Sequence, residues 1–343
     1  MSDRESANCA ECHDQVDRRD FLRAVRGAGT MAASVALTAS VPRSLFAFEP
    51  PVAPPMPKAP RPAEGLCKEL FATLTADQRR QVLLPWDNAN RRRFYNAPMN
   101  VRIGQVYTQP QKELLERIMK SISSGDDGYT KLSRNGGWDT GGGFGGCGAN
   151  FFGDPAGDRT QWAWVFTGHH LTVRCDGDSE PDAAWGGPMY YGHIADGHSQ
   201  RNVFHFQTRA VNTVFDALSE AQRRTAVISR GTPGEGIQSV AFRRDGFPGI
   251  RSGDLTADQK RLVETTMRDI LAPYRREDVD EVMSIIRRNG GLDRLHFAFY
   301  RDADATDQTR WSFWRIEGPG FVWNYRVMPH VHCYVNIAAR PQA

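Results

Sequence analysis

The 343-residue chain has no run of about 18 consecutive apolar residues, the length that a transmembrane helix requires. We therefore expect no stable membrane insertion of the mature protein. A net charge of +3 is small for a protein that binds phosphate backbones, so we expect no nucleic-acid partner. Six cysteines are too few for a disulfide scaffold of this length. With 40% hydrophobic and 24% charged residues, the composition is that of a folded globular protein.

Three common catalytic signatures are also missing. The segment 136–153 holds nine glycines, but it lacks the Gly-Lys-Ser/Thr of a phosphate-binding loop. No strand–glycines–helix order surrounds it, which excludes the dinucleotide-binding fingerprint. The chain also has no G-x-S-x-G motif of a serine nucleophile. The glycine-rich segment is either a flexible rim loop beside a pocket or an ordinary surface loop.

Residues 1–47 are predicted to be a twin-arginine signal peptide. Arg18 and Arg19 precede a weakly apolar stretch at 24–41, which is the layout of such signals. The alternative is a flexible basic terminus. The signal predicts recognition by the twin-arginine export machinery and a periplasmic or secreted location. Because that route carries folded proteins, it favours a protein that takes up its cofactor before export.

Two further features lie ahead of the folded part. The stretch from Cys9 to His13 has the C-x-x-C-H spacing of haem attachment, but cleavage of the signal would remove it. Residues 48–65 are predicted to be a Pro-rich linker, since seven prolines fall between 48 and 63. The remaining residues, 66–343, are expected to form a single domain.

Four cysteines belong to this predicted domain: Cys67, Cys147, Cys175 and Cys333. An oxidising compartment would permit up to two disulfides among them, and the connectivity cannot be deduced from sequence. Cys333 follows His332 directly and is an alternative thiolate ligand for a metal, although a buried or bridged state is favoured.

The predicted domain contains two similar halves, at about 66–200 and 201–343, which indicates an internal duplication. The matching segments recur in the same order at a nearly constant offset. They are 71–80 with 215–224, 108–119 with 256–267, 134–139 with 288–293, and Trp164 and Gly168 with Trp314 and Gly318.

Each half is predicted to contain helices followed by strands. Thr108 followed by Gln111 is typical of a capped helix start, and the apolar residues behind them repeat at helical spacing. The alternating aromatic segments 162–175 and 311–327 indicate strands. The expected fold class is therefore α+β, with pseudo-twofold symmetry and with the strands of both halves meeting centrally.

Histidines appear where the two halves differ. The first half has His169 and His170 at the position where the second has Pro319 and Gly320. A second pair, His330 and His332, follows the last strand of the second half. The repeated scaffold does not need these side chains, so we treat them as candidate metal ligands.

The spacing of these histidines suits a shared metal ion. In an extended segment His330 and His332 point the same way and can bind one ion. His169 and His170 would point to opposite faces of a strand, so only one is expected to bind directly; His170 is favoured slightly, and the other would orient it. Three imidazoles with an open position are typical of a catalytic site. The ion would be copper, zinc or iron, with nickel also compatible. The alternative is that these histidines are incidental.

Other polar residues are weaker candidates. His193 and His198, expected in a loop, are candidates for completing the site or binding substrate, and Glu317 for acting as a base if it faces the histidines. The acidic segment 176–182 is better explained as a solvated turn than as a calcium site. His205 and the strand residue His296 are expected to be packed histidines.

These motifs together resemble the family catalogued as domain of unknown function 3500, over roughly residues 66–337. The matching motifs are Trp162-x-Trp164-x-Phe166-x-Gly168-His169-His170-Leu171, Arg315-Ile316-Glu317-Gly318-Pro319-x-Phe321 and His330-x-His332. The resemblance implies a bacterial, often exported protein without a settled reaction, and it carries the family's histidine signatures to His169, His170, His330 and His332. The family usually has an acidic Glu-Tyr-Asp-like stretch where this chain has Asn324-Tyr325-Arg326, so no carboxylate role carries over there.

Two functions from different classes fit these observations. The first is an exported metal-dependent enzyme, for which we favour an oxidoreductase over a hydrolase, acting on an unknown small molecule. The second is a non-catalytic periplasmic protein that binds a metal or a small ligand.

Overall fold

The computed structural model describes residues 62–157, 160–229, 231–301 and 311–339. The predicted signal peptide and residues 48–61 of the predicted linker lie outside these ranges. The first described helix, α2 (Pro62–Thr73), begins four residues before the domain boundary expected at 66. Proline suits this first helical position, because its fixed φ is already helical and the amide it lacks would have no partner there.

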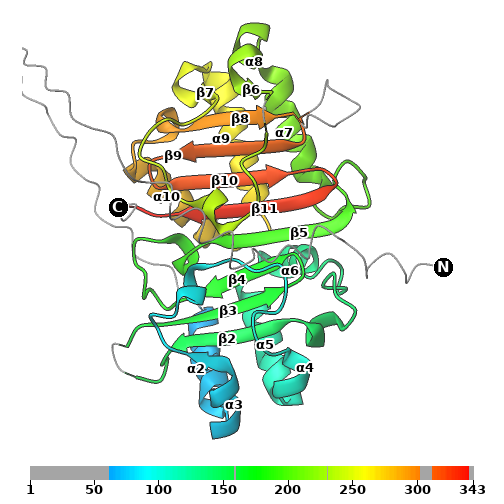
Figure 1. The fold of residues 1–343 in the computed structure, drawn as a ribbon, viewed down its shortest axis with the longest axis vertical. Helices are drawn as coiled ribbons and strands as arrows, with labels where there is room; N and C mark the ends of the chain where they lie inside the picture. Colours follow the sequence, from blue (N-terminus) through cyan, green and yellow to red (C-terminus); the bar gives the residue numbers. More distant parts are fainter. Residues whose placement is uncertain (1–61, 158–159, 230, 302–310, 340–343) are drawn as a thin grey trace, which may run out of the picture. The chain divides into compact units, whose positions relative to one another are not determined.

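One sheet of eleven strands organises the described residues (Figure 1). Its strand order is β1-β2-β3-β4-β5-β11-β10-β9-β8-β6, with β7 paired to β8. The strands are β1 (Leu83–Leu84), β2 (Gly148–Gly153), β3 (Trp162–Gly168), β4 (Leu171–Cys175), β5 (Met189–Asp196), β6 (Val227–Ile228), β7 (Ile250–Arg251), β8 (His296–Tyr300), β9 (Phe313–Gly318), β10 (Phe321–Arg326) and β11 (His330–Ile337).

Strand pairing follows the same order in the two halves of the sheet. In each half a two-residue strand at the edge of the sheet pairs in parallel with its neighbour in the sheet: β1 with β2, and β6 with β8. The remaining pairs of the sheet are antiparallel, and the halves join where β5 pairs with β11. The α+β class is therefore confirmed, with one mostly antiparallel sheet. The pseudo-twofold symmetry and the common origin of the two halves stay predictions.

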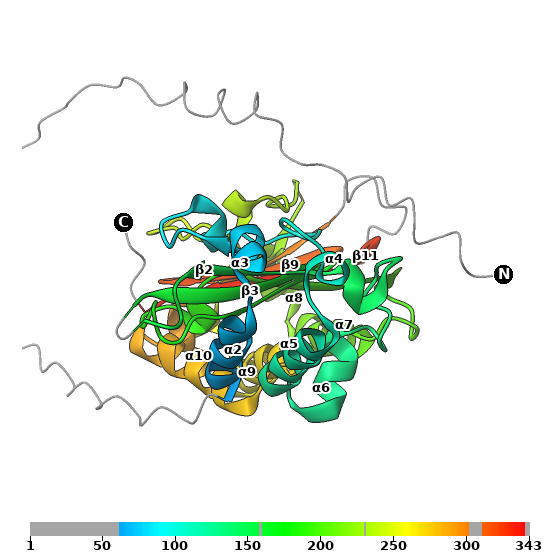
Figure 2. The ribbon, with the colours of Figure 1, turned by 90° about the horizontal axis from the view of Figure 1, so that it is seen from below.

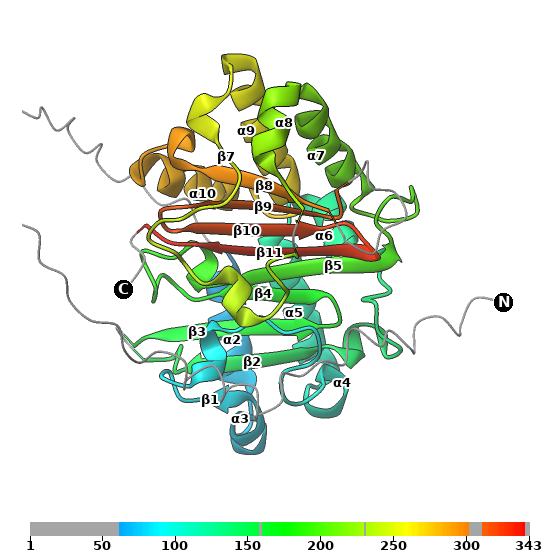
Figure 3. The ribbon, with the colours of Figure 1, turned by 45° about the horizontal axis from the view of Figure 1, so that its top comes forward.

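The longer helices cover one face of the sheet (Figure 2). The helices after α2 are α3 (Ala76–Val82), α4 (Ile103–Val106), α5 (Gln109–Ile122), α6 (Gly125–Leu132), α7 (His205–Ala217), α8 (Glu220–Ala226), α9 (Ala257–Leu271) and α10 (Arg276–Arg288). The opposite face is crossed by segments with little regular structure. The yellow-green segment that carries the short 3-10 helix η6 (Ile237–Val240) passes over β10 and β11 (Figure 3). Among the described residues, no helix has the length and apolar character needed to cross a bilayer.

Aromatic residues fill the space between the sheet and the helices. Trp164, Trp314 and Trp323 are almost completely buried in the main core. Burying an aromatic side chain of this size contributes about 2–3 kcal/mol. Residues on the opposite side of β3, such as Val165, pack into a smaller cluster under the covering loops. Both faces of the sheet are therefore largely buried.

The four cysteines of the domain are free thiols in the structure. The disulfides that an oxidising compartment would permit are therefore not present here. Cys67, Cys147 and Cys333 are buried, and burial raises the pKa of each of these thiols. Cys333 accepts a hydrogen bond from Nε1 of Trp323 at 3.1 Å, on the side of β11 opposite His332. It is therefore not placed to act as a metal ligand with that histidine.

Two pairs of glutamines join helix starts that are far apart in the sequence. Gln78 and Gln111 exchange amide hydrogen bonds of 2.8 and 3.1 Å, and Gln222 and Gln259 exchange bonds of 2.9 and 2.8 Å. Each glutamine oxygen also accepts the backbone N–H of its own helix cap, which completes a capping box. The repeated glutamines of the sequence are therefore structural.

We predict that the buried pair Gln78–Gln111 is energetically coupled. Replacing Gln111 by alanine should cost about 1–3 kcal/mol, because the amide of Gln78 loses partners inside the protein. In a double-mutant cycle with Gln78→Ala, the two losses should fall short of additivity by about 1 kcal/mol. Urea unfolding measures both quantities. Gln81→Ala, on the exposed side of α3, is the control and should cost less than about 0.5 kcal/mol. Additive losses would contradict the pairing.

Candidate metal centre

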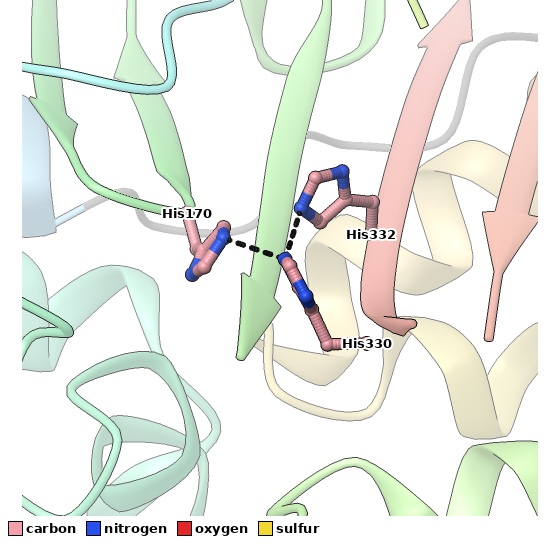
Figure 4. Close-up of side chains that lie close together, drawn as sticks. All are labelled: His170, His330 and His332. Atoms are coloured by element: carbon pink, nitrogen blue, oxygen red, sulfur yellow. Dashed lines mark hydrogen bonds between the residues drawn. The ribbon is translucent and has the colours of Figure 1, made fainter. Parts of the chain in front are cut away.

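Three imidazole rings from two distant segments converge where the turn between β3 and β4 lies near the start of β11 (Figure 4). Nε2 of His330 lies 3.1 Å from Nε2 of His170 and 2.9 Å from Nε2 of His332. The three residues are 0%, 4% and 4% exposed for His170, His330 and His332. Among the described residues, this is the one cluster whose histidine, cysteine and carboxylate atoms lie close enough together to hold a metal ion.

Strand geometry accounts for the pair on β11. His330 and His332 are two residues apart at the start of the strand, so both side chains leave the same face. The register with β5 shifts between His330 and Val331, which is a bulge at this end of the strand. Gly192 of β5 faces His332, and a side chain there would collide with the backbone oxygen of Val331 and press on the His332 ring.

A two-residue turn between β3 and β4 supplies the third ring. His169 and His170 form this turn. The expectation that they point to opposite faces of a strand is therefore wrong. Their rings stack at 3.9 Å, and only His170 joins the cluster. His170 has a φ of +57°, and in the corresponding turn between β9 and β10 the equivalent residue is Gly320, with a φ of +64°. A histidine here accepts backbone strain that glycine avoids.

Asp139 anchors the turn between β3 and β4 through hydrogen bonds. Its carboxylate lies 2.8 Å from Nδ1 of His170 and 3.0 Å from Nδ1 of His193, and it accepts the backbone N–H of Ile194. The Arg134 guanidinium is 3.6 Å away. Burial would raise the pKa of Asp139, but the hydrogen bonds from both histidines and the charge of Arg134 hold this pKa well below its usual range.

A second carboxylate serves His332. Nδ1 of His332 lies 3.0 Å from Oε1 of Glu235 and 3.1 Å from the hydroxyl of Tyr334, which itself donates to Glu235. Arg326 donates through Nη1 to Oε2 of Glu235 at 2.6 Å. Burial raises the pKa of Glu235, against the lowering effect of the Arg326 charge.

All three rings are neutral at neutral pH. Burial lowers the pKa of His170 and of His332 well below the ordinary value, and it lowers that of His330 to about 4, with the charge of Arg326 adding to the effect on the last two. Because Nδ1 of His170 and of His332 donates to a carboxylate, the Nε2 atom of each ring carries a lone pair. We assign these tautomers from the hydrogen-bond partners.

A proton on His330 and the Arg326 guanidinium serve the Nε2 atoms of the metal-free cluster. Nε2 of His330 can donate to one neighbour only, whereas rings on both sides present lone pairs to it. Nη2 of Arg326 lies 3.0 Å from Nε2 of His332 and 3.4 Å from Nε2 of His330, so the guanidinium faces the same point. Converging neutral imidazoles with carboxylates behind them form the donor set that transition metals prefer.

The remaining candidate histidines take other positions. His169 contacts the backbone oxygen of Asp139 through Nδ1 at 2.6 Å, beside the cluster. His193 lies on β5 and not in a loop, where it shares Asp139 with His170. His198 follows β5 in a turn, where its backbone amide bonds Asp196.

Glu317 does not face the three imidazoles. It is buried on β9 and forms an ion pair with Arg315, and its strand partners are His296 and Val322. Tertiary packing thus places it away from the cluster. In the acidic segment 176–182, Glu180 pairs with Arg91 and Arg92, as expected of a turn without a metal.

Four residues that surround the cluster were not identified from the sequence: Asp139, Glu235, Tyr334 and Arg326. Asp139 had a signal, since it ends the repeated motif at 134–139. Glu235 lies in an irregular segment, and Arg326 lies near the end of a strand, where no spacing distinguishes it. Tyr334 continues the alternation of His330 and His332 on β11, so its position on their face could have been deduced.

Comparison with known proteins agrees with the motifs. The model of the DUF3500 family, described as a protein of unknown function, matches residues 62–339. The chain belongs to the DUF3500 family. No curated protein and no solved structure shows detectable similarity to it. Membership in the DUF3500 family therefore confirms the resemblance of the motifs, while the function has to be argued from the site.

We predict that the strain at His170 can be measured separately from its role as a ligand. His170→Gly should be more stable than His170→Ala by about 1 kcal/mol, because glycine adopts a positive φ without penalty. Thermal denaturation of the metal-free variants measures the difference. The same two substitutions at His169, whose φ is not positive, form the control and should rank in the opposite order. Equal stability of the His170 variants would contradict the left-handed turn.

Proposed function

We propose that this protein binds a transition-metal ion, copper, zinc or iron, through His170, His330 and His332, and that the ion is a reaction centre. The observation that carries the proposal is the convergence of three buried Nε2 atoms, two of them with their Nδ1 atoms bonded to carboxylates. Such carboxylates orient a metal-binding histidine and increase its basicity. When bound, the ion would supply Lewis-acid or redox chemistry.

Three protein ligands support a catalytic role. Structural zinc sites are usually closed by four protein ligands, whereas catalytic sites keep a position for water or substrate. In the described residues no fourth histidine, cysteine or carboxylate joins the cluster. Arg326 also contacts Nε2 of His332, but it is a cation and cannot serve as a ligand.

Within the enzyme classes we favour an oxidoreductase over a hydrolase. Tyr190 and Tyr334 stack at a ring separation of 4.7 Å, and the edge of the pair contacts His332. Oxidisable aromatic rings directly beside a ligand suit a redox metal better than a hydrolytic one.

A non-catalytic metal-sequestering protein is the second candidate. The near-complete burial of the three ligand residues favours it, because a stored ion needs no access for substrate. The two candidates differ in whether an added ligand reaches the ion. Azide should change the absorption spectrum of the copper- or iron-loaded enzyme, or of a zinc site substituted with cobalt(II), whereas a coordinatively saturated storage protein should not respond.

We further propose that the protein is exported by the twin-arginine machinery to the periplasm or beyond, where it acts on a small molecule. Arg18 and Arg19 and the apolar stretch after them support export. The matching strand orders of the two halves support their origin by duplication, after which the first half kept the histidine turn and the second kept the pair on β11.

The test is metal analysis of protein purified without a His-tag. We predict a stoichiometric transition metal in the wild type and a loss of at least tenfold in bound metal in His170→Ala and in His332→Ala, since each removes one of three ligands. His296→Ala, on β8, is the matched control and should retain the metal. Unchanged metal content in both ligand variants would refute the shared site.

A further inference from the structure

Two ion pairs lie beside the cluster before any ion is bound. Among the described residues, Asp139 pairs with Arg134, and Glu235 pairs with Arg326. A divalent ion on three neutral imidazoles would therefore add two positive charges that these side chains do not offset. Uncompensated charge in a buried site is costly, so the loaded centre favours an anion.

The Arg326 guanidinium provides a second reason. Nη2 of Arg326 faces Nε2 of His332 at 3.0 Å and Nε2 of His330 at 3.4 Å, while Nη1 donates to Glu235. An ion bound by the imidazoles takes the Nε2 lone pairs of both rings, and Nη2 then loses these two acceptors. A ligand with two oxygen atoms, one toward the ion and one toward the guanidinium, replaces them. Arginine is well suited to planar oxygen anions for this reason.

Exposure indicates the direction of entry and the size of the ligand. The side chains of Glu235 and Arg326 are 30% and 11% exposed, whereas that of His332 is 5% exposed. A solute therefore reaches the ion pair before it reaches the imidazoles. The buried position of the rings restricts the ligand to a small molecule.

We propose that the metal centre binds a small carboxylate anion, held jointly by the ion and by Arg326, and that a small carboxylate is accordingly the substrate class. This inference rests on the metal site proposed above. Arg326 then has two states: it occupies the lone pairs of the metal-free cluster, and it anchors the anion in the loaded one.

The experiment uses the full chain loaded with cobalt(II), whose visible absorption reports its coordination. Sodium acetate is the probe, and sodium perchlorate at equal ionic strength is the salt control. We expect a saturable spectral change with acetate and none with perchlorate. Arg326→Gln should weaken acetate binding at least tenfold. Arg326→Lys keeps the charge without the planar guanidinium, so its acetate affinity should lie between those of the wild type and Arg326→Gln. Arg243→Gln is the matched control, because Arg243 is an exposed partner of Glu317 and should not affect acetate binding.

The outcomes separate this inference from the metal site itself. Arg326→Gln should also bind cobalt more tightly than the wild type in the absence of acetate, because a competing cation is removed. If wild-type protein binds cobalt but acetate leaves its spectrum unchanged, the inference is wrong and the metal site stands. Equal acetate affinity in wild type and Arg326→Gln also overturns it. Failure of the wild type to bind cobalt refutes the metal site, and the inference with it. The wild-type titration decides the matter even if Arg326→Gln does not fold.

Discussion

The antiparallel pairing of β5 with β11 is the contact on which the rest of the structure depends. It joins the two halves into one sheet, and it places the start of β11 beside the turn between β3 and β4. His170 and His330, which are 160 positions apart in the chain, meet only because of this pairing. Gly192 allows the strands to approach where the rings converge. The strand pairing that completes the sheet thus also assembles the cluster.

Hydrogen bonds at the far side of two of the three rings determine what the cluster can do. Asp139 and Glu235 accept hydrogen bonds from Nδ1 of His170 and of His332, which leaves the Nε2 lone pairs of these two rings directed at a common point. The same burial that lowers the pKa of the histidines keeps them unprotonated. Three neutral imidazoles that converge on one point form a donor set that suits a transition-metal cation.

The two halves share a scaffold but not a site. Within each half a glutamine pair joins two helix starts, and a two-residue turn links two strands, β3 to β4 in one half and β9 to β10 in the other. In one turn the left-handed residue is His170, in the other it is Gly320. The scaffold residues therefore account for folding. Glycine adopts this positive φ without strain, so the turn itself does not require a histidine there.

Much of the scaffold could be predicted from local patterns, because caps, helical spacing and strand alternation act over a few residues. The helix starts at Thr108 and Thr256, the α+β class and the common direction of His330 and His332 belong to this part. Tertiary structure alone decided that His170 and not His169 enters the cluster, because a left-handed turn, and not strand alternation, directs its ring. It also decided that Glu235 and Arg326 surround the cluster and that Glu317 does not, because burial and charge pairing arise only when distant segments pack together.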